Sequence, residues 1–381
     1  MGNASLLNYI KEKINTTGPM TFASFMEIAL YHDKWGYYTN NAVLGRHGDF
    51  YTSSHVSPIF GLMLARQLNE MWTEAGKPNK WELIEYGPGE GLLARDILMA
   101  LKKEFPDLFT SLRYRAMETS PSLVQRQRDL WNNPELHNAN MGWIKHLDEV
   151  SPKPFHGCIF SNELVDAFPV HIVRQTRDGL KELYVMIKDD QLKLVTGEPS
   201  THDLDHYFAR QGITLAEGQT AEVNLNAYNW LMSVVNHINK GFIITIDYGA
   251  LADELYSQAR FDGTLRCFHR HQLKTSPLKN IGQQDITASV NFTALQKWGI
   301  DAGLCNLGTI NQSQFLINLG ILNELKPKQE YSYDPAIMKK TMAVKQLIMP
   351  EGMGQTFKVL IQSKGFNNPP TLSGMRAGRG I

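Results

Sequence analysis

The sequence predicts an α/β fold that is built on a mostly parallel, doubly wound sheet. Strand-like and helix-like patterns alternate from Trp81 onwards. The stretch GPGEG at 87–91 places three glycines in the turn between a strand pattern and a helix pattern. Acidic residues close several of the expected strands, and ligands of open α/β sheets bind at that end of the strands.

The N-terminal part of the chain, residues 1–78, is expected to form a helical cap that contributes to the ligand site. Apolar spacing predicts helices over 5–14, 21–31 and 59–72, with Thr21 as the N-cap of the second. The long loop before the third helix is rich in Gly, Ser, Tyr and Trp. Such a loop is typical of a functional segment.

Residues 79–365 are expected to form the α/β core, with an insertion at about 170–222. The insertion is polar and hairpin-like, with turn signals at Asp178-Gly179 and Asp189-Asp190, which predicts antiparallel strands. The core strands are expected at Leu83–Glu85, 113–118, 157–163, 241–249 and in a final hairpin near 353–365, with a helix over 226–239. The Pro- and Gly-rich tail, 366–381, is expected to be disordered.

Composition excludes several classes of function. The 381 residues contain 38 basic and 38 acidic side chains, so no bulk charge indicates nucleic acid as the principal partner. No apolar run reaches the roughly 20 residues of a membrane span, so membrane insertion is not expected. Three widely spaced cysteines and the absence of a recognisable leader indicate a reducing, cytoplasmic location.

The glycine turn does not suit a phosphate ligand. A dinucleotide fingerprint requires glycine where Leu92 stands, and Glu90 would repel a diphosphate. No P-loop pattern is present either. The form ExGxGxG, which begins at Glu85, is instead typical of S-adenosylmethionine-dependent methyltransferases. A purely structural turn is the alternative.

Acidic and amide side chains are expected to converge at one edge of the sheet. Glu85, Glu118 and Asp247 each close a predicted parallel strand, and Asn162-Glu163 closes another. Carboxylates at this edge favour the ammonium and sulfonium charges of S-adenosylmethionine. Glu118, which follows the strand after the glycine turn, is the expected ribose ligand.

Five motifs in order carry a resemblance to a known family. They are GDFYTSSHVSPIFG, IEYGPGEG, SNELVDAFPVH, IDYG and TLRCFHRHQLKTSPLKNIGQQDITASVNFTAL. Together they resemble the MidA-like methyltransferases, over nearly the whole chain from about Gly18 to about Gly365. That family includes a mitochondrial factor that methylates an arginine of a respiratory complex I subunit during assembly.

The resemblance implies a Rossmann-like class I methyltransferase core that binds S-adenosylmethionine and methylates arginine in a protein partner. It further implies three groups of site residues. The implied cofactor ligands are Glu85, Gly87, Gly89, Gly91, Glu118, Asp49, Phe50, Thr52, Ser53 and Asn162, and the implied catalytic residues are Glu163, Asn162 and Asp166. Arg266, His271 and Asp285 belong to later signatures whose roles the resemblance leaves open.

The sequence departs from the family pattern at a few positions. Ser289 and Asn291 stand where the family has histidine and aspartate, and Phe168 replaces a leucine. The first two departures are expected to affect acceptor specificity more than the cofactor site.

Glu163 is the expected catalytic carboxylate. An arginine guanidinium stays protonated at neutral pH, so a carboxylate must orient it and help to remove a proton. Asn162 stands beside Glu163 and is expected to orient it. The alternative is that Glu163 caps the helix that follows. No metal is expected, because His269 and His271 are two residues apart with no further ligands adjoining them.

Three functional hypotheses remain open from the sequence. The preferred one is a protein arginine methyltransferase whose partner is a protein such as a complex I subunit. The second is a catalytically silent S-adenosylmethionine-binding assembly factor. The third, a nicotinamide-dependent oxidoreductase, is disfavoured by Leu92 and Glu90. The oligomeric state is not predicted.

Overall fold

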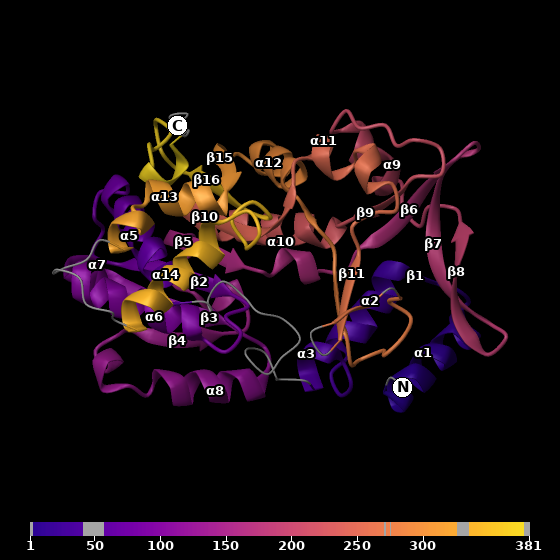
Figure 1. Ribbon diagram of the computed structural model, residues 1–381, viewed down its shortest axis with the longest axis horizontal. Coiled ribbons are helices and arrows are strands. Elements are labelled where there is room, and N and C mark those ends of the chain that lie inside the picture. Colours follow the sequence, from indigo (N-terminus) through magenta and orange to yellow (C-terminus); the bar gives the residue numbers. More distant parts are fainter. Residues whose placement is uncertain (1–2, 41–56, 270–271, 275, 326–334, 377–381) are drawn as a thin grey trace. The chain divides into compact units, whose positions relative to one another are not determined.

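A computed structural model describes residues 3–40, 57–269, 272–274, 276–325 and 335–376. The chain divides into two compact units, and each is described by itself (Figure 1). Unit 1 comprises Met1–Phe50, Val165–Trp230 and Gly249–Leu295. Unit 2 comprises Tyr51–Leu164, Leu231–Tyr248 and Gln296–Ile381.

Unit 2 is built on a mostly parallel sheet, as the sequence predicts. The strand order is β15-β16-β10-β5-β2-β3-β4, and along this order β16 alone runs antiparallel to the other strands. The strands are β2 (Trp81–Tyr86), β3 (Leu112–Met117), β4 (Met141–Ile144), β5 (Phe155–Asn162), β10 (Ile238–Ala250), β15 (Cys305–Asn311) and β16 (Phe357–Lys364). Because the order reverses between β2 and β5, the expected ligand position is at the carboxyl ends of these two strands.

Helices cover the sheet of unit 2 (Figure 1). They are α5 (Pro58–Glu74), α6 (Leu92–Glu104), α7 (Pro106–Ser111), α8 (Pro121–Trp131), α13 (Gln312–Asn318), α14 (Pro335–Ile348) and the short η1 (Pro134–Leu136), η2 (Leu147–Glu149), η5 (Ile321–Leu325) and η6 (Ser373–Met375). Two helices cross the division between the units, α10 (Leu225–His237) and α12 (Phe292–Asp301). In α6, for example, Leu93, Ile97 and Leu101 form a buried apolar face.

Helix α5, which was predicted to be part of the N-terminal cap, belongs to unit 2 instead. A Cβ at Gly61 of α5 would lie 2.6 Å from the Cβ of Asp96 in α6. Only glycine therefore permits the close approach of these two helices. A sequence pattern shows that α5 has an apolar face but not which element covers it.

Unit 1 contains the antiparallel lobe that the insertion predicts. Its main sheet has the order β1-β7-β6-β9, with β8 paired to β7. The strands are β1 (Met20–Thr21), β6 (His171–Thr176), β7 (Gly179–Lys188), β8 (Gln191–Gly197) and β9 (Thr220–Val223). A smaller sheet consists of β11 (Arg266–His269), β12 (Gln272–Lys274) and β13 (Asp285–Thr287), while β14 (Val290–Asn291) pairs with the end of β10.

The N-terminal helices share one hydrophobic core with this lobe. The helices of unit 1 are α1 (Ala4–Thr17), α2 (Phe22–Tyr31), α3 (Tyr37–Asn40), α9 (Asp203–Ala209), α11 (Ala252–Leu255), η3 (Val165–Ala167) and η4 (Gln258–Arg260). Leu6 and Phe25 from the helices are fully buried in one cluster with Val185 of β7 and Ile286 of β13. Thr21 caps α2 as predicted, since its side chain accepts a hydrogen bond from the Ser24 amide.

The C-terminal segment also differs from the expectation of disorder. Residues 366–376 are described and include η6. The backbone amide and hydroxyl of Ser373 donate to the carboxylate of Glu70 in α5, and Asn318 of α13 donates to the Gly374 carbonyl. Proline and glycine therefore limit regular structure here without preventing docking, while 377–381 lie outside the described residues.

Candidate active site

The glycine turn after β2 adopts a backbone that requires glycine. Gly87, Gly89 and Gly91 have φ values of 64°, 55° and 80°, all in the left-handed region. A Cβ at Gly91 would also lie 2.9 Å from the Trp131 indole. The turn leads directly into α6, which begins after Gly91 without a side-chain cap. The predicted glycine-dependent turn is therefore present between β2 and α6.

Glu85 and Glu118 lie at the ends of neighbouring strands, as predicted. Glu85 is almost fully buried and accepts a 2.5 Å hydrogen bond from the Tyr114 hydroxyl. Burial raises the pKa of Glu85 to about 7, although the bond from Tyr114 acts in the opposite direction. An opposite charge from a bound cation would favour its ionised form.

Glu118 is held in place by the chain that follows it. Its Oε1 accepts hydrogen bonds from the amides of Thr119 and Ser120, at 2.9 and 2.8 Å. Burial raises the pKa of Glu118, and these bonds together with one from the Gln127 side chain lower it. The end of β3 also meets the glycine turn, because the Gly87 amide donates to the Met117 carbonyl at 3.2 Å. This position suits a carboxylate that binds ribose hydroxyls beside the turn.

Asn162 and Glu163 form a pair at the end of β5. The Asn162 Nδ2 donates to the Glu163 Oε1 at 3.2 Å, the arrangement that the sequence predicts. Glu163 has a φ of 55°, which is uncommon for a residue with a Cβ and costs on the order of 1–3 kcal/mol. Its amide donates to the Ile246 carbonyl on β10, which fixes this strained residue. Such backbone strain is typical of functional positions.

Asp247, at the end of the segment of β10 in unit 2, performs a local structural role. Its Oδ2 accepts a hydrogen bond from the Leu164 amide and its Oδ1 one from the Tyr248 amide. The amide after Glu163 is thus bonded to Asp247. The bond from Asn162 orients the Glu163 carboxylate itself.

Asp166 belongs to unit 1, in the short helix η3. It is 4 % exposed, and its carbonyl accepts from the Ala288 amide. Tyr38 donates to the Oδ1 of Asp285 at 2.8 Å. Burial raises the pKa of Tyr38 well above its usual value, and Asp285 and Asp166 raise it further. Asp166 and Asp285 therefore share one buried polar cluster with Tyr31 and Tyr38.

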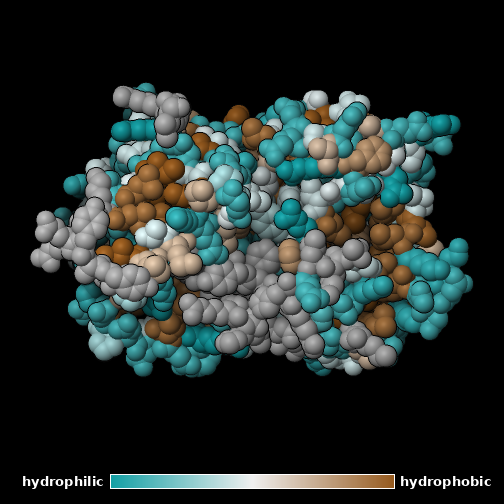
Figure 2. Space-filling view, in the orientation of Figure 1, coloured by the Kyte–Doolittle hydropathy of each residue, from teal (hydrophilic) through white to brown (hydrophobic). Residues whose placement is uncertain are grey.

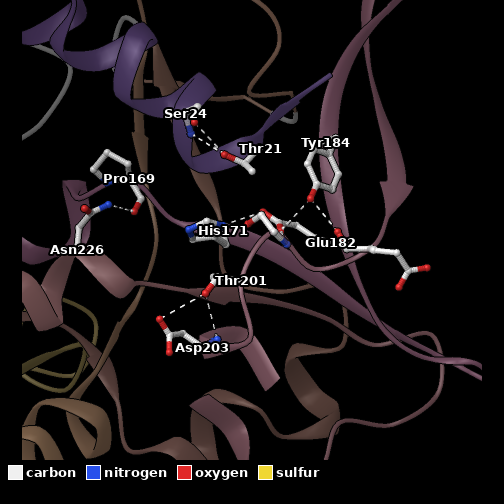
Figure 3. Close-up of polar contacts among 11 residues, drawn as sticks. Thr21, Ser24, Pro169, His171, Glu182, Tyr184, Thr201, Asp203 and Asn226 are labelled. Carbon is white, nitrogen blue, oxygen red and sulfur yellow. Dashed lines mark hydrogen bonds and ion pairs between the residues drawn. The ribbon is translucent and has the colours of Figure 1, made fainter. Parts of the chain in front are cut away.

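The segment from Val165 to His171 is held by hydrogen bonds from several elements of unit 1. Figure 3 shows two of them, from Asn226 to the Pro169 carbonyl and between His171 and Glu182. The buried Glu182 carboxylate accepts from His171 Nδ1 at 2.7 Å and from the Ser200 amide at 2.6 Å. Two further bonds run from Asn224 to the Val165 carbonyl and from Tyr31 to the Ala167 carbonyl.

The structure describes only some of the other predicted site residues. Asp49, Phe50, Thr52, Ser53 and His271 lie outside the described residues. Arg266 is exposed at the start of β11. In the described ranges no group of three or more His, Cys, Asp or Glu side chains is arranged to hold a metal ion. Within those same ranges, no helix combines the length and apolar character of a membrane span.

The departure at position 291 has a structural explanation. Asn291 is 6 % exposed, and its Nδ2 donates to the Tyr207 hydroxyl and to Gln211. Its Oδ1 accepts from the Ala294 amide in the first turn of α12. The Asn291 side chain thus takes part in a buried hydrogen-bond network and caps α12. Ser289 is half-buried and its amide donates to the Thr264 hydroxyl.

Three comparisons with known proteins decide the family. A family described as S-adenosyl-L-methionine-dependent methyltransferases matches residues 63–310. The chain belongs to this family. A crystal structure of a COG1565 superfamily member from Burkholderia thailandensis, bound to S-adenosyl-homocysteine, superposes with a TM-score of 0.87 at 30 % identity, covering 98 % of this chain and 95 % of that one.

Curated relatives agree with this assignment. The mitochondrial protein arginine methyltransferase NDUFAF7 of Xenopus tropicalis is 32 % identical, covering 97 % of this chain and 89 % of the relative. The protein of the same name from Homo sapiens is 27 % identical, over 92 % and 82 %. The chain is thus an S-adenosylmethionine-dependent methyltransferase, and the nicotinamide alternative is excluded.

The residues of unit 2 fit this cofactor. The left-handed glycine turn brings backbone close to a ligand, and Glu85 and Glu118 add negative potential where a sulfonium and an ammonium would bind. Gln127, Trp131 and Trp143, which contact the turn or one another, were not predicted as site residues. Their only signal in the sequence is the i, i+4 spacing of Gln127 and Trp131 on one helix face.

Proposed function

We propose that the methyl acceptor is an arginine side chain of a protein partner. The observation that carries the proposal is the strained, oriented carboxylate of Glu163 at the edge of the sheet where β2 and β5 end. Protein arginine methyltransferase is also the name of the curated relatives. Both features support an acceptor that is positively charged and planar.

The geometry of Glu163 suits the chemistry of a guanidinium. When bound, S-adenosylmethionine supplies an electrophilic methyl group that reacts by in-line displacement. Glu163 accepts N–H bonds from the protonated guanidinium and aligns one nitrogen for attack. The bond from Asn162 to Oε1 limits rotation of the carboxylate, so that both oxygens keep a defined direction. After transfer, the same carboxylate accepts the proton that the nitrogen loses.

Replacing the charge of Glu163 tests this role. Glu163→Gln keeps the size of the side chain but removes the negative charge, so methyl transfer should fall by about 10²–10⁴-fold. The affinity for S-adenosylhomocysteine should stay within about twofold of wild type, because Glu163 is assigned to the acceptor. Labelled methyl transfer into a cell extract and calorimetric binding measure the two quantities.

The exposed Glu74 at the end of α5 provides the matched control. Glu74→Gln should leave both quantities unchanged. Normal turnover by Glu163→Gln would remove Glu163 from catalysis. If the wild-type protein binds cofactor but labels no protein, the alternative of a silent assembly factor replaces the proposal. Mass spectrometry of labelled proteins identifies the acceptor, since only methylarginine supports it.

The identity and location of the partner remain predictions. A complex I subunit follows from the family resemblance, and the curated relatives are named as mitochondrial proteins. For this chain, the sequence itself predicts a cytoplasmic location. Fractionation of cells that express the tagged protein would distinguish a cytoplasmic from an organellar location.

A further inference from the structure

One face of α8 contacts the carbonyl groups of the second and third glycines of the cofactor turn. The Gln127 Nε2 donates to the Gly89 carbonyl at 2.7 Å. The Trp131 Nε1, one helical turn later, donates to the Gly91 carbonyl at 2.9 Å. Both side chains are buried, at 0 % and 6 % exposure.

The amide of Gln127 is itself fixed in one orientation. The Trp143 Nε1 on β4 donates to the Gln127 Oε1 at 2.7 Å. An indole N–H can only donate, so it selects the rotamer in which the Gln127 oxygen faces Trp143 and the nitrogen faces the turn. Trp143 stacks on Trp131 with ring centroids 5.1 Å apart, which orders the two indoles together.

The Gln127 side chain also influences Glu118, the predicted ribose ligand. A hydrogen bond from the Gln127 side chain helps to keep the pKa of Glu118 from rising further with burial. The Gln127 amide thus contacts the glycine turn after β2, and its effect on the pKa of Glu118 places it near the carboxylate that follows β3.

Fixing a carbonyl also fixes the amide beyond it. Peptide groups are planar and trans, so the Glu90 N–H points opposite to the Gly89 carbonyl that Gln127 holds. The amide of Leu92, the first residue of α6, is likewise directed by the bond from Trp131 to Gly91. Without these bonds the glycines, which have the widest conformational freedom, would have to be ordered when the ligand binds.

We propose that Gln127 is a positioning residue for the cofactor, holding the Gly89 peptide in its binding geometry through an orientation set by Trp143. Gln127 does not touch the reacting atoms. Its contribution is to the affinity for S-adenosylmethionine and S-adenosylhomocysteine, and not to the rate once the cofactor is bound.

Gln127→Met tests the proposal, because methionine keeps the length of the side chain and removes its donors. The dissociation constant for S-adenosylhomocysteine, measured by calorimetry, should rise about tenfold, as expected for losing more than one buried hydrogen bond. Gln125 lies on the same helix, is exposed and bonds only to Asp129 among the recorded contacts, so Gln125→Met is the matched control. It should bind within about twofold of wild type.

A purely structural role predicts a different pattern. In that case Gln127→Met would lower the thermal unfolding temperature of the ligand-free protein while folded molecules bind as tightly as wild type, and the proposal would be overturned. The positioning role also predicts that the loss of S-adenosylhomocysteine binding at low pH moves to higher pH in Gln127→Met. The bond to Glu118 is then missing, so the pKa of that carboxyl rises.

Trp143→Phe provides a second test that keeps an aromatic ring beside Trp131 and removes the indole N–H donor. It should weaken binding by a smaller factor than Gln127→Met. The double variant should bind like Gln127→Met alone, because Trp143 acts through Gln127. If Gln127→Met does not fold, Trp143→Phe decides: unchanged affinity in that variant contradicts the proposal, and weakened affinity with an unchanged unfolding temperature supports it.

Discussion

Glu85 carries a carboxyl group that is 3 % exposed in the folded protein. Burial raises its pKa to about 7, against an ordinary value of 4.5. The folded protein therefore favours the protonated form at pH values where the unfolded chain is ionised. Stability from this group is present below about pH 4.5 and is lost as the pH rises through about 7.

Removing the ionisable group should make this pH dependence visible. Glu85→Gln still accepts the bond from Tyr114 but cannot ionise. Without cofactor, the variant should exceed wild type in free energy of unfolding by about 3 kcal/mol at pH 8, the order that the pKa shift implies, and by little at pH 4. Denaturant unfolding at both pH values measures the difference.

The exposed Glu74 again serves as the control, since Glu74→Gln should show no such pH dependence. An equal effect of Glu85→Gln at both pH values would mean that Glu85 is not the titrating group. A bound sulfonium favours the ionised carboxylate, so wild-type protein near pH 7 should also release protons when it binds S-adenosylmethionine. The bound ligand thus offsets the unfavourable ionisation of Glu85 in the ligand-free protein.

Single residues were predictable where chemistry or backbone demands one residue type. The left-handed turn requires Gly87, Gly89 and Gly91, and the sequence shows them directly. Gln127 was not predicted, because a glutamine in a helix is usually exposed and no pattern marks the one whose partners come from β4 and the glycine turn. Its role depends on tertiary contacts that local spacing does not encode.

At the level of elements, the start of α12 shows how a departure from a family pattern is accommodated. Asn291 caps this helix and donates to Tyr207 and Gln211 of the α9 region. An aspartate could cap equally well but could not donate to Gln211. The role recorded for Asn291 is therefore in the packing of unit 1, and its effect on acceptor specificity stays a prediction.

Truncating Asn291 should destabilise the protein. Asn291→Ala removes the cap, worth about 0.5–2 kcal/mol, and leaves buried polar groups without their partner, at about 1–3 kcal/mol. The free energy of unfolding should fall by about 2–4 kcal/mol. Asn15→Ala, at an exposed position in α1, should change it by less than about 0.5 kcal/mol.

Denaturant unfolding compares the two asparagine variants. Equal effects of Asn291→Ala and Asn15→Ala would show that the buried network contributes nothing measurable. The methylated residue, identified by mass spectrometry, should be the same in Asn291→Ala and wild type. A change of acceptor would return position 291 to the specificity role that the sequence suggested.

Elements with long periodic patterns were predicted best. The strand expected over 241–249 is β10, Ile238–Ala250, and the helix expected over 226–239 is α10, Leu225–His237. The small sheet that contains β11, β12 and β13 was not predicted, because strands of three or four residues are too short to show a period. In addition, β13 pairs with β11 although β12 and the segment that follows it separate them in the sequence, so this pairing is not local.

For the whole molecule, the fold class was predictable and the division into units was only partly so. The alternating patterns predicted the parallel sheet of unit 2 and the antiparallel insertion. The division differs because α1 and α2 share a core with the insertion while α5 packs on α6. Hydrophobic periodicity identifies an apolar face, whereas the choice of partner depends on shape, as the contact between Gly61 and Asp96 illustrates.

The surface of unit 2 exposes apolar side chains of α13, η5 and α14, and Figure 2 shows hydrophobic residues gathered in the region of α13 and α14. We call this the α14 patch. Its exposed members are Ile317, Leu322, Ile337, Met338, Met342 and Met349. The chain has a formal net charge of zero and a pI near 7.2, so repulsion between molecules is weakest near neutral pH. Exposed apolar surface then has its largest influence on association.

A charge placed inside the α14 patch should reduce this association more than the same charge placed elsewhere. Met342 is 66 % exposed in the patch, and Ile300, 57 % exposed in α12, provides a site outside it. Met342→Lys and Ile300→Lys each add one positive charge and remove one exposed apolar side chain. Static light scattering at pH 7.2 should show weaker attraction between molecules for Met342→Lys than for Ile300→Lys, and the gap should narrow at pH 9, where net charge already keeps molecules apart. Identical scattering from the two variants at pH 7.2 would mean that net charge, and not the apolar patch, governs the solubility of the protein.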